Sequence, residues 1–272
     1  MNNKSPQKIQ PRSSAAAIKA PLPRAGVADS PRLEKLFEVI HEDADLLVVH
    51  KPADLVCHPT KGDEYSSLIS RARIYLKTAS VPHLVNRLDR ETSGLVVIAK
   101  NSLAARELGK IWEARGVQKE YRAIVHGHVT AEQGMIDAPL GKDETSIVAI
   151  KDCVRPDGAA AQTEFFVEKR FERGGGAFTL MRVAPRTGRK HQIRIHLAHL
   201  GHPIVGDKLY GGDEDLYLAL VQGRLTEEQR ARLILPNHAL HASSLKFQWR
   251  ERDWHFTSLP EPVFLEFCEN ES

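Results

Sequence analysis

The chain contains few cysteines, and they are widely spaced. Its 272 residues include three, Cys57, Cys153 and Cys268. An odd number at such separations indicates neither a disulfide framework nor a C-x-x-C zinc half-site. This pattern is typical of a protein kept in a reducing compartment, and we expect a cytoplasmic location.

Long apolar segments and a strong charge excess are also missing. Hydrophobic residues make up 42% of the chain, enough for a sizeable core, but no run approaches membrane-spanning length. The formal net charge is +3, and residues 1–35 alone carry +5, which leaves −2 for the rest. We therefore expect no membrane partner, and any nucleic-acid surface must be a local basic patch.

The sequence has no Walker loop and no dinucleotide-binding fingerprint. Its glycine run, Gly174-Gly175-Gly176, lacks the following Lys and helix of a phosphate loop and is interpreted as a hairpin turn. Ser93 precedes a glycine but does not lie in a Gly-x-Ser-x-Gly elbow. These absences argue against a phosphate-loop enzyme and against a serine hydrolase.

The first 35 residues differ in composition from the rest of the chain. Residues 1–32 contain five prolines and no aromatic residue, which predicts a disordered basic tail over residues 1–35. It lacks the apolar core of a secretory signal, so export is not expected. An organellar transit peptide, a phosphate-contacting arm and a solvated tail stay open as alternatives. Residues 36–272 show no internal repeat or linker and are expected to form one domain.

The periodicity of residues 36–272 predicts an α+β fold. Short turns join many β-branched or alternating runs, which favours a mixed, largely antiparallel sheet with flanking helices. A further helix should open at the capping box Thr226-Glu227-Glu228-Gln229. The expected strands are 37–41, 46–50, 95–99, 119–126, 162–171, 177–184, 239–249 and 253–258, and the other expected helices are 64–77, 102–115 and 190–200.

The stretch Asn86–Gly94 carries the clearest sign of chemistry. Asp89 lies just before the apolar run Leu95–Ala99, so we expect it on a short loop at the entrance to a buried strand. Arg87 and Arg90 flank it, and an opposite charge within a few Å lowers the pKa of an aspartate by about 1–3 units. Such a carboxylate stays ionised, as a nucleophile or general base requires. A surface ion-pair loop is the alternative that composition alone favours.

The string Arg87-Leu88-Asp89-Arg90-Glu91-Thr92-Ser93-Gly94 resembles the signature of the RluA family of RNA pseudouridine synthases. There, Arg-Leu-Asp-x-x-Thr-Ser-Gly surrounds the catalytic aspartate, and the family usually has His where this chain has Asn86. Further segments match the family in order, so the resemblance covers most of residues 36–248. They are Lys51-Pro52, Lys119-Glu120-Tyr121, Arg186–His196 continued by Gly201–Asp207, and Leu240-His241-Ala242.

The resemblance implies a pseudouridine synthase fold over residues 36–272, with a central catalytic cleft. Asp89 is its expected catalytic residue, Arg194 pairs with Asp89, and Tyr121 stacks beneath the target uracil. Arg87 fills the stack that the flipped base leaves. Thr187-Gly188 should turn the chain into a helix whose positive end suits phosphate. The other expected substrate-binding residues are Ile193 and Leu240 in the pocket wall, and Arg186, Arg189 and Lys190 beside that helix end.

The resemblance also implies the reaction. An isomerase of this kind breaks the C1′–N1 bond of uridine and rejoins the base through C5, and the target must be flipped out of its stem or loop. No metal or cofactor is implied, because the reaction is redox-neutral and the base is retained. The expected partner is a structured RNA, ribosomal or transfer, and the chain is expected to act as a monomer without an obligate protein partner.

Several alternatives remain at this level. His196, His199 and His202 recur at i+3 near Asp207, a zinc-like pattern, but the helix breaks before His202 and the adjacent block is cationic. Tyr121 is alternatively a core aromatic with its hydroxyl hydrogen-bonded. The chain is alternatively an RNA-binding or RNA-folding protein that keeps the fold without turnover. A nuclease is disfavoured because no paired metal carboxylates or His pair is assembled.

Overall fold

The computed structural model describes residues 37–59, 66–77 and 81–269. The predicted basic tail, residues 1–35, lies outside the described residues, and so does the start of the helix expected at 64–77. None of the helices in the described ranges is long and apolar enough to cross a membrane.

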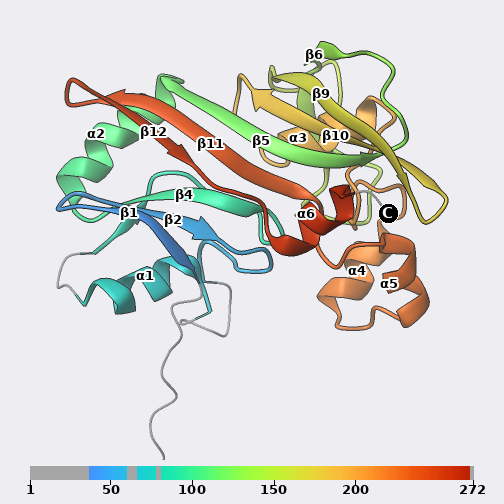
Figure 1. The fold of residues 1–272 in the computed structure, drawn as a ribbon, viewed down its shortest axis with the longest axis horizontal. Coiled ribbons are helices and arrows are strands. Elements are labelled where there is room, and N and C mark those ends of the chain that lie inside the picture. Colours follow the sequence, from blue (N-terminus) through green and yellow to red (C-terminus); the bar gives the residue numbers. More distant parts are fainter. Residues whose placement is uncertain (1–36, 60–65, 78–80, 270–272) are drawn as a thin grey trace, which may run out of the picture. The chain divides into compact units, whose positions relative to one another are not determined.

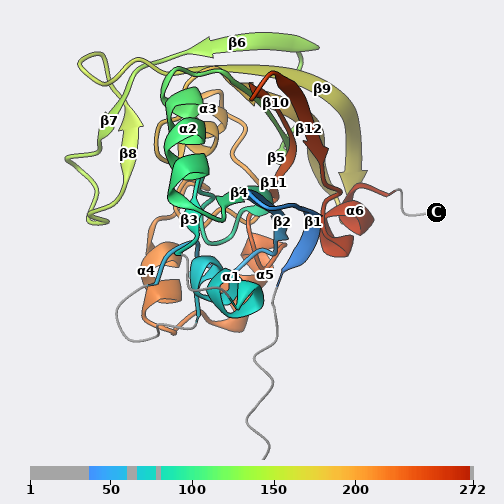
Figure 2. The ribbon, with the colours of Figure 1, turned by 90° about the vertical axis from the view of Figure 1, so that its left-hand side faces the viewer.

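The described strands form one ten-stranded sheet (Figure 1) and a separate two-stranded ribbon, labelled in Figure 2. Every pairing in them is antiparallel except that of β4 with β11. The predicted mixed, largely antiparallel sheet is therefore confirmed. Its order is β1 (Glu38–Glu42), β2 (Leu46–Lys51), β4 (Ser93–Ala99), β11 (Leu240–Trp249), β5 (Val117–His126), β10 (Gly176–Pro185), β9 (Gln162–Arg173) and β6 (Gln133–Asp137), with β3 (His83–Leu84) beside β4 and β12 (Arg252–Thr257) beside β11, while β7 (Leu140–Lys142) pairs with β8 (Asp152–Val154).

Two helices cover opposite faces of the β2–β4 half of the sheet. They are α1 (Leu68–Leu76) and α2 (Ser102–Glu113), with the strands between them (Figure 2). Successive side chains of a strand point to opposite faces of its sheet, and β2 and β4 carry apolar side chains on each of the two faces. Leu95 and Val97 pack in the cluster that contains α2, whereas Val96 and Ile98 pack in the cluster that contains α1. This two-sided burial explains the unbroken apolar run of β4.

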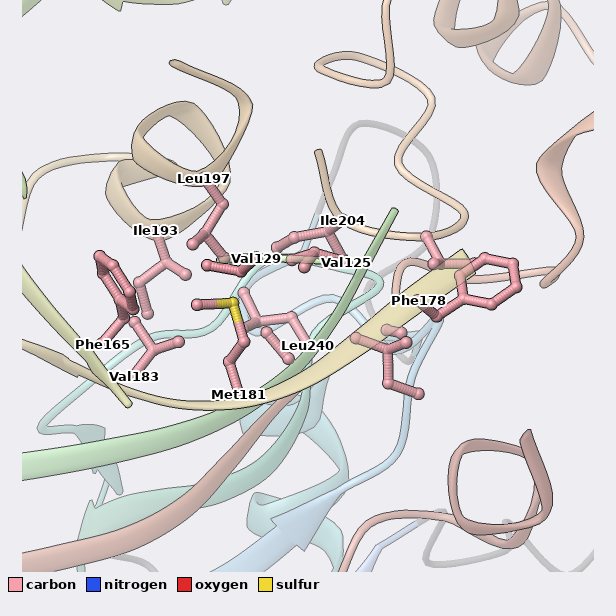
Figure 3. Packing of buried hydrophobic residues seen from close by; sticks show 14 of the residues in the cluster. Val125, Val129, Phe165, Phe178, Met181, Val183, Ile193, Leu197, Ile204 and Leu240 are labelled. Carbon is pink, nitrogen blue, oxygen red and sulfur yellow. The ribbon is translucent and has the colours of Figure 1, made fainter. Parts of the chain in front are cut away.

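A second core lies under β5, β9 and β10. It packs against α3 (Gln192–His199) and α6 (Pro262–Cys268). Figure 3 shows Ile193 and Leu197 of α3 pointing toward Met181 and Val183 of β10. The remaining helices of the described part are α4 (Asp215–Val221) and α5 (Glu227–Leu233).

The parallel contact between β4 and β11 joins the two halves of the sheet. Gly94 pairs with Ala242, and a Cβ at position 94 would lie 2.3 Å from the Ala242 carbonyl oxygen. Gly94 also has φ +112, which favours glycine. On its other side Ala242 pairs with Tyr121. The two pairings therefore place Gly94, at the end of the Asp89 loop, and Tyr121 on opposite sides of Ala242.

The predicted elements agree with the structure, apart from their ends and some short pieces. Asn101 caps α2, the Thr226 capping box is formed, and the glycine run is the hairpin turn between β9 and β10. The helix expected at 190–200 was placed too early, because His191 adopts φ 55 and α3 begins at Gln192. The sequence reading missed β3, β6, β7, β8, α4 and α6, which are too short to show a clear periodicity.

Candidate active site

Asp89 lies on a tight turn between β3 and β4. The turn is closed by the Thr92 N–H, which donates to the Asp89 carbonyl at 3.2 Å. The Asp89 side chain is 30% exposed, so part of it reaches solvent. This is the position expected of a residue that reaches a substrate.

Arg194 joins Asp89 to a second carboxylate. Its Nη1 donates to Asp89 Oδ2 at 2.9 Å, while Nε and Nη2 donate to the two oxygens of Asp207 at 2.7 and 2.9 Å. The expected Asp89–Arg194 pair is thus confirmed. Asp207 is fully buried and accepts from the Leu209 and Tyr210 N–H groups. The sequence reading considered Asp207 only as a metal ligand and missed it as the residue that orients Arg194.

The charges in the row Asp207–Arg194–Asp89 keep the carboxylates of Asp89 and Asp207 ionised. Burial raises the pKa of Asp89, but the charge and hydrogen bond of Arg194, together with the neighbouring His191 and His238, outweigh it, and the pKa lies below its usual value. The same balance of burial and Arg194 places the pKa of Asp207 far below its usual range. The expected role of Arg90 in this balance was wrong, because its guanidinium is exposed and pairs with Asp54 at 2.7 Å. The stabilising cation comes from a distant part of the chain.

His191 is a further neighbour of Asp89 that the sequence reading did not single out. Its Nε2 lies 3.8 Å from Asp89 Oδ1, and its Nδ1 lies 2.9 Å from the Tyr210 hydroxyl. Burial lowers the pKa of His191, so the ring is neutral at pH 7. The signal that could have found it is its place in the motif block, beside Gln192 and Arg194.

Tyr121 lies on β5. It packs against the hydrophobic cluster that contains α3 and against the cluster that contains α1. Its hydroxyl makes no hydrogen bond within the described residues, and burial with the nearby charge of Asp89 raises its pKa. A core tyrosine normally has a hydrogen-bonded hydroxyl. The stacking role of Tyr121 stays a prediction, and the alternative of an ordinary core aromatic stays open.

Three side chains tie the Asp89 loop to its surroundings. Asn86 donates to the Leu95 carbonyl at 3.2 Å and accepts from the Val97 N–H at 2.8 Å, so its amide pairs with β4 as a strand residue would. The Cys57 thiol lies 3.4 Å from both the N and O of Leu88. Lys51 is fully buried and donates to the Arg90 carbonyl at 3.0 Å, and also to the carbonyls of Pro52 and Leu55.

Among the predicted phosphate contacts, two of the cations are already paired. Arg186 lies 2.6 Å from Glu164, and Lys190 lies 2.9 Å from Asp152. Arg189 is exposed and donates to the Ala160 carbonyl. The helix was expected to follow Thr187-Gly188 directly, but it begins at Gln192, and the Gln192 side chain accepts from the Arg189 N–H and the Thr187 hydroxyl in the turn before it.

The remaining predicted substrate residues lie in different environments. Arg87 is exposed and has no ion-pair or hydrogen-bond partner within the described ranges, so its guanidinium is free to move. Ile193 and Leu240 are 6% and 5% exposed and lie in the core of Figure 3. Their role in lining a base pocket stays a prediction.

Two histidines of the zinc-like pattern, His196 and His202, have other partners. His196 is fully buried between Thr163 and the Ala138 carbonyl, at 2.8 and 2.9 Å. His202 Nδ1 lies 2.8 Å from the His126 carbonyl. The described ranges contain no group of three or more His, Cys, Asp or Glu placed to hold a metal ion. These ring nitrogens therefore serve the fold.

Comparison with known families gives one match that covers the site. The model of the family described as "RNA pseudouridylate synthase" matches residues 45–199. That range contains Asp89, Tyr121 and Arg194.

Curated relatives point the same way. An uncharacterized RNA pseudouridine synthase of Aquifex aeolicus is 40% identical over 181 residues, covering 64% of this chain and 56% of that protein. The ribosomal large subunit pseudouridine synthase D of Yersinia pestis is 34% identical over 241 residues, covering 84% of this chain and 68% of that protein. The chain thus spans between about half and two thirds of the length of these relatives.

Solved structures show the same fold. Human RNA pseudouridylate synthase domain containing 1 superposes with a TM-score of 0.68 at 24% identity, covering 87% of this chain and 89% of that one. Human RNA pseudouridylate synthase domain containing 4 gives 0.65 at 26%, covering 84% and 90%. Together with the family match and the relatives, this shows that the chain belongs to the RNA pseudouridylate synthase family, in its RluA branch.

Proposed function

We propose that this chain is a pseudouridine synthase that isomerises a uridine of structured RNA, with residues 36–272 as its catalytic domain. The observation that carries the proposal is the row Asp207–Arg194–Asp89, in which one guanidinium joins two carboxylates at 2.7 to 2.9 Å. It holds an ionised carboxylate, 30% exposed, near enough to Tyr121 for its charge to raise the pKa of that tyrosine.

The chemistry requires the N1–C1′ bond of uridine to break and a C5–C1′ bond to form. The proton on C5 is lost and N1 gains one, so atoms and charge balance without an added reactant. Asp89 serves either as a nucleophile toward C1′ or as a base toward a ribose proton. Both roles need an ionised carboxylate at a fixed position, and Arg194 provides both properties because it is itself fixed by Asp207.

The substrate must leave its helix to reach Asp89. Flipping a nucleotide costs a few kcal/mol, which stacking in the enzyme offsets. The ring of Tyr121 supplies a flat surface, and stacking on an aromatic side chain contributes about 1–3 kcal/mol per base. Arg87, two residues before Asp89, is exposed and has no partner among the described residues, which suits it to fill the gap in the RNA stack.

The first RNA to test is that of the large ribosomal subunit, because several relatives carry that substrate in their names. Transfer RNA is the second. Pseudouridine mapping of total RNA from cells with and without the gene should show one or more sites that vanish on deletion. Those sites should return with the wild-type gene and stay absent with Asp89→Asn. If no site changes, or if Asp89→Asn restores every effect of deletion, the chain is an RNA-binding or RNA-folding protein instead.

A further inference from the structure

Glu91 lies in the same turn as Asp89 but points the other way, into the protein. Its carboxylate is 11% exposed and lies 2.9 Å from the ammonium of Lys208, which is 4% exposed. Glu91 also accepts the main-chain N–H of His238 at 3.2 Å. A nearly buried ion pair thus lies directly behind the turn that presents Asp89.

Lys208 is held as firmly as Glu91. Besides Glu91, its ammonium donates to the Pro236 carbonyl at 2.6 Å and to the Gly206 carbonyl at 3.3 Å. Lys208 directly follows Asp207, the residue that orients Arg194. The Glu91–Lys208 pair therefore connects the segment that holds Arg194 to the turn that holds Asp89.

The side chain next to Glu91 strengthens this connection. The Thr92 hydroxyl lies 2.7 Å from Nε2 of the buried His238. From the opposite side, Lys51 holds the Arg90 carbonyl. Both the backbone and the side chains of the turn are therefore fixed around Asp89.

We propose that Glu91 and Lys208 are positioning residues for Asp89, which set its distance and angle to Arg194 and to the substrate. Neither residue contacts Asp89 directly; they act through the turn Asp89–Thr92 and through Asp207. The proposal rests on the proposed function for its catalytic consequence. Its physical content, that this ion pair fixes the turn, is independent of it.

The test is a double-mutant cycle of Glu91→Gln and Lys208→Met, measured by single-turnover kinetics on the mapped RNA. Misplacing a reacting group by about 1 Å costs about 100-fold in rate, so each single variant should lower kcat by about that factor. RNA affinity and KM should not change, because the substrate surface is untouched. The double variant should be no slower than the slower single variant, because both remove the same connection.

Glu214→Gln is the matched control. Glu214 also pairs with a lysine, Lys151, at 2.7 Å, and also accepts a main-chain N–H, that of Ile147 at 3.2 Å. It lies outside the Asp89 turn. A residue that is merely structural lowers stability without changing kcat per folded molecule, and this is the result expected for Glu214→Gln. The same result for Glu91→Gln would overturn the proposal.

Hydrogen exchange separates this proposal from the proposed function. Glu91→Gln should speed exchange of the amides of residues 86–93, while Glu214→Gln leaves them as in the wild type. Faster exchange in a protein that forms no pseudouridine would keep the positioning role of Glu91 and reject the enzymatic assignment. Unchanged exchange in the Glu91 variant would reject the positioning role whatever the activity.

Discussion

At the scale of single residues, the site is a row of alternating charges. Arg194 lies between two carboxylates, one of them fully buried and one partly open. A buried ion pair stabilises only when its hydrogen bonds are complete, and removal of one partner leaves an uncompensated charge. Any change of Arg194 should therefore lower the stability of the protein, whereas a change of the partly exposed Asp89 should lower it less.

Asp89→Asn should abolish isomerisation and leave fold and RNA affinity nearly intact. The amide keeps the shape of the carboxylate and its contact with Arg194, but supplies neither a nucleophile nor a base. Thermal unfolding, RNA binding and pseudouridine formation by the purified variant check this. Turnover at the wild-type rate would remove Asp89 from the reaction.

Arg194→Met should lose both activity and stability. It leaves Asp89 and Asp207 without their cation, and breaking a buried pair costs about 3–5 kcal/mol. Arg90→Met is the control, because Arg90 pairs with Asp54 at an exposed position, where an ion pair contributes about 0–1 kcal/mol. Urea denaturation of both variants should separate them clearly, and equal stabilities would contradict the buried row.

Tyr121 separates stacking from hydrogen bonding. Tyr121→Phe keeps the ring and should retain much of the substrate binding, because the hydroxyl has no protein partner within the described residues. Tyr121→Ala should impair binding and turnover, by about 1–3 kcal/mol in affinity. Binding and single-turnover measurements on the mapped RNA decide the matter. Small and equal effects of the two changes would return Tyr121 to an ordinary core position.

At the scale of elements, the parallel pairing of β4 with β11 fixes where the candidate site forms. Gly94 approaches Ala242 more closely than any side chain allows, and Ala242 in turn pairs with Tyr121. The amide of Asn86 pairs with β4 at Leu95 and Val97. The position at which the family usually has His thus serves here to fix the start of the Asp89 loop.

Gly94→Ala should destabilise the protein severely, by about 3 kcal/mol or more, because it combines overpacking with an unfavourable positive φ. Gly109→Ala is the matched control. Gly109 lies in α2 with nothing within 4 Å of an added Cβ, so alanine should stabilise the helix by up to about 1 kcal/mol. Denaturation midpoints of the two variants should move in opposite directions. A Gly94→Ala protein as stable as the wild type would show that the strands are less closely paired.

At the scale of the whole molecule, buried neutral histidines make stability depend on pH. His238 and His241 are both buried. Burial lowers the pKa of His238 to about 3 and that of His241 to about 4. In the unfolded chain a histidine titrates near about 6.5. Between these values the unfolded state binds protons that the folded state does not bind.

Stability should therefore fall as the pH falls from about 7 toward 4. Each histidine accounts for about 2 kcal/mol between pH 7 and pH 5. Asp207 does not offset this loss, because its lowered pKa contributes stability that is lost only below the unfolded value of about 3.9.

Urea denaturation at pH 7.5 and 5.0 measures the effect. His241→Asn should reduce the difference between the two pH values, while His83→Asn, on the exposed strand β3, should leave it unchanged. An equal pH dependence in the wild type and the His241 variant would contradict the inferred burial of a neutral ring.

The sequence alone was sufficient for the fold class, for the longer helices and strands, and for the motif that marks the candidate site. Helices and strands depend on local periodicity, which residues a few positions apart determine. The motif also indicated the pair Asp89 and Arg194, although 105 positions separate them, through its resemblance to a family. The short elements β3, β6, β7, β8, α4 and α6 carried too little periodicity to be found.

Only the tertiary structure decided which partners the charged groups have. Arg90 follows Asp89 directly but pairs with Asp54, while the cation that pairs with Asp89 is Arg194, 105 positions away along the chain. Glu91, in the same turn as Asp89, likewise pairs with a residue distant in the sequence, Lys208. Which partner a charged group finds depends on strand register, on the close pairing of Gly94 with Ala242 and on burial. None of these is a property of neighbouring residues in the sequence.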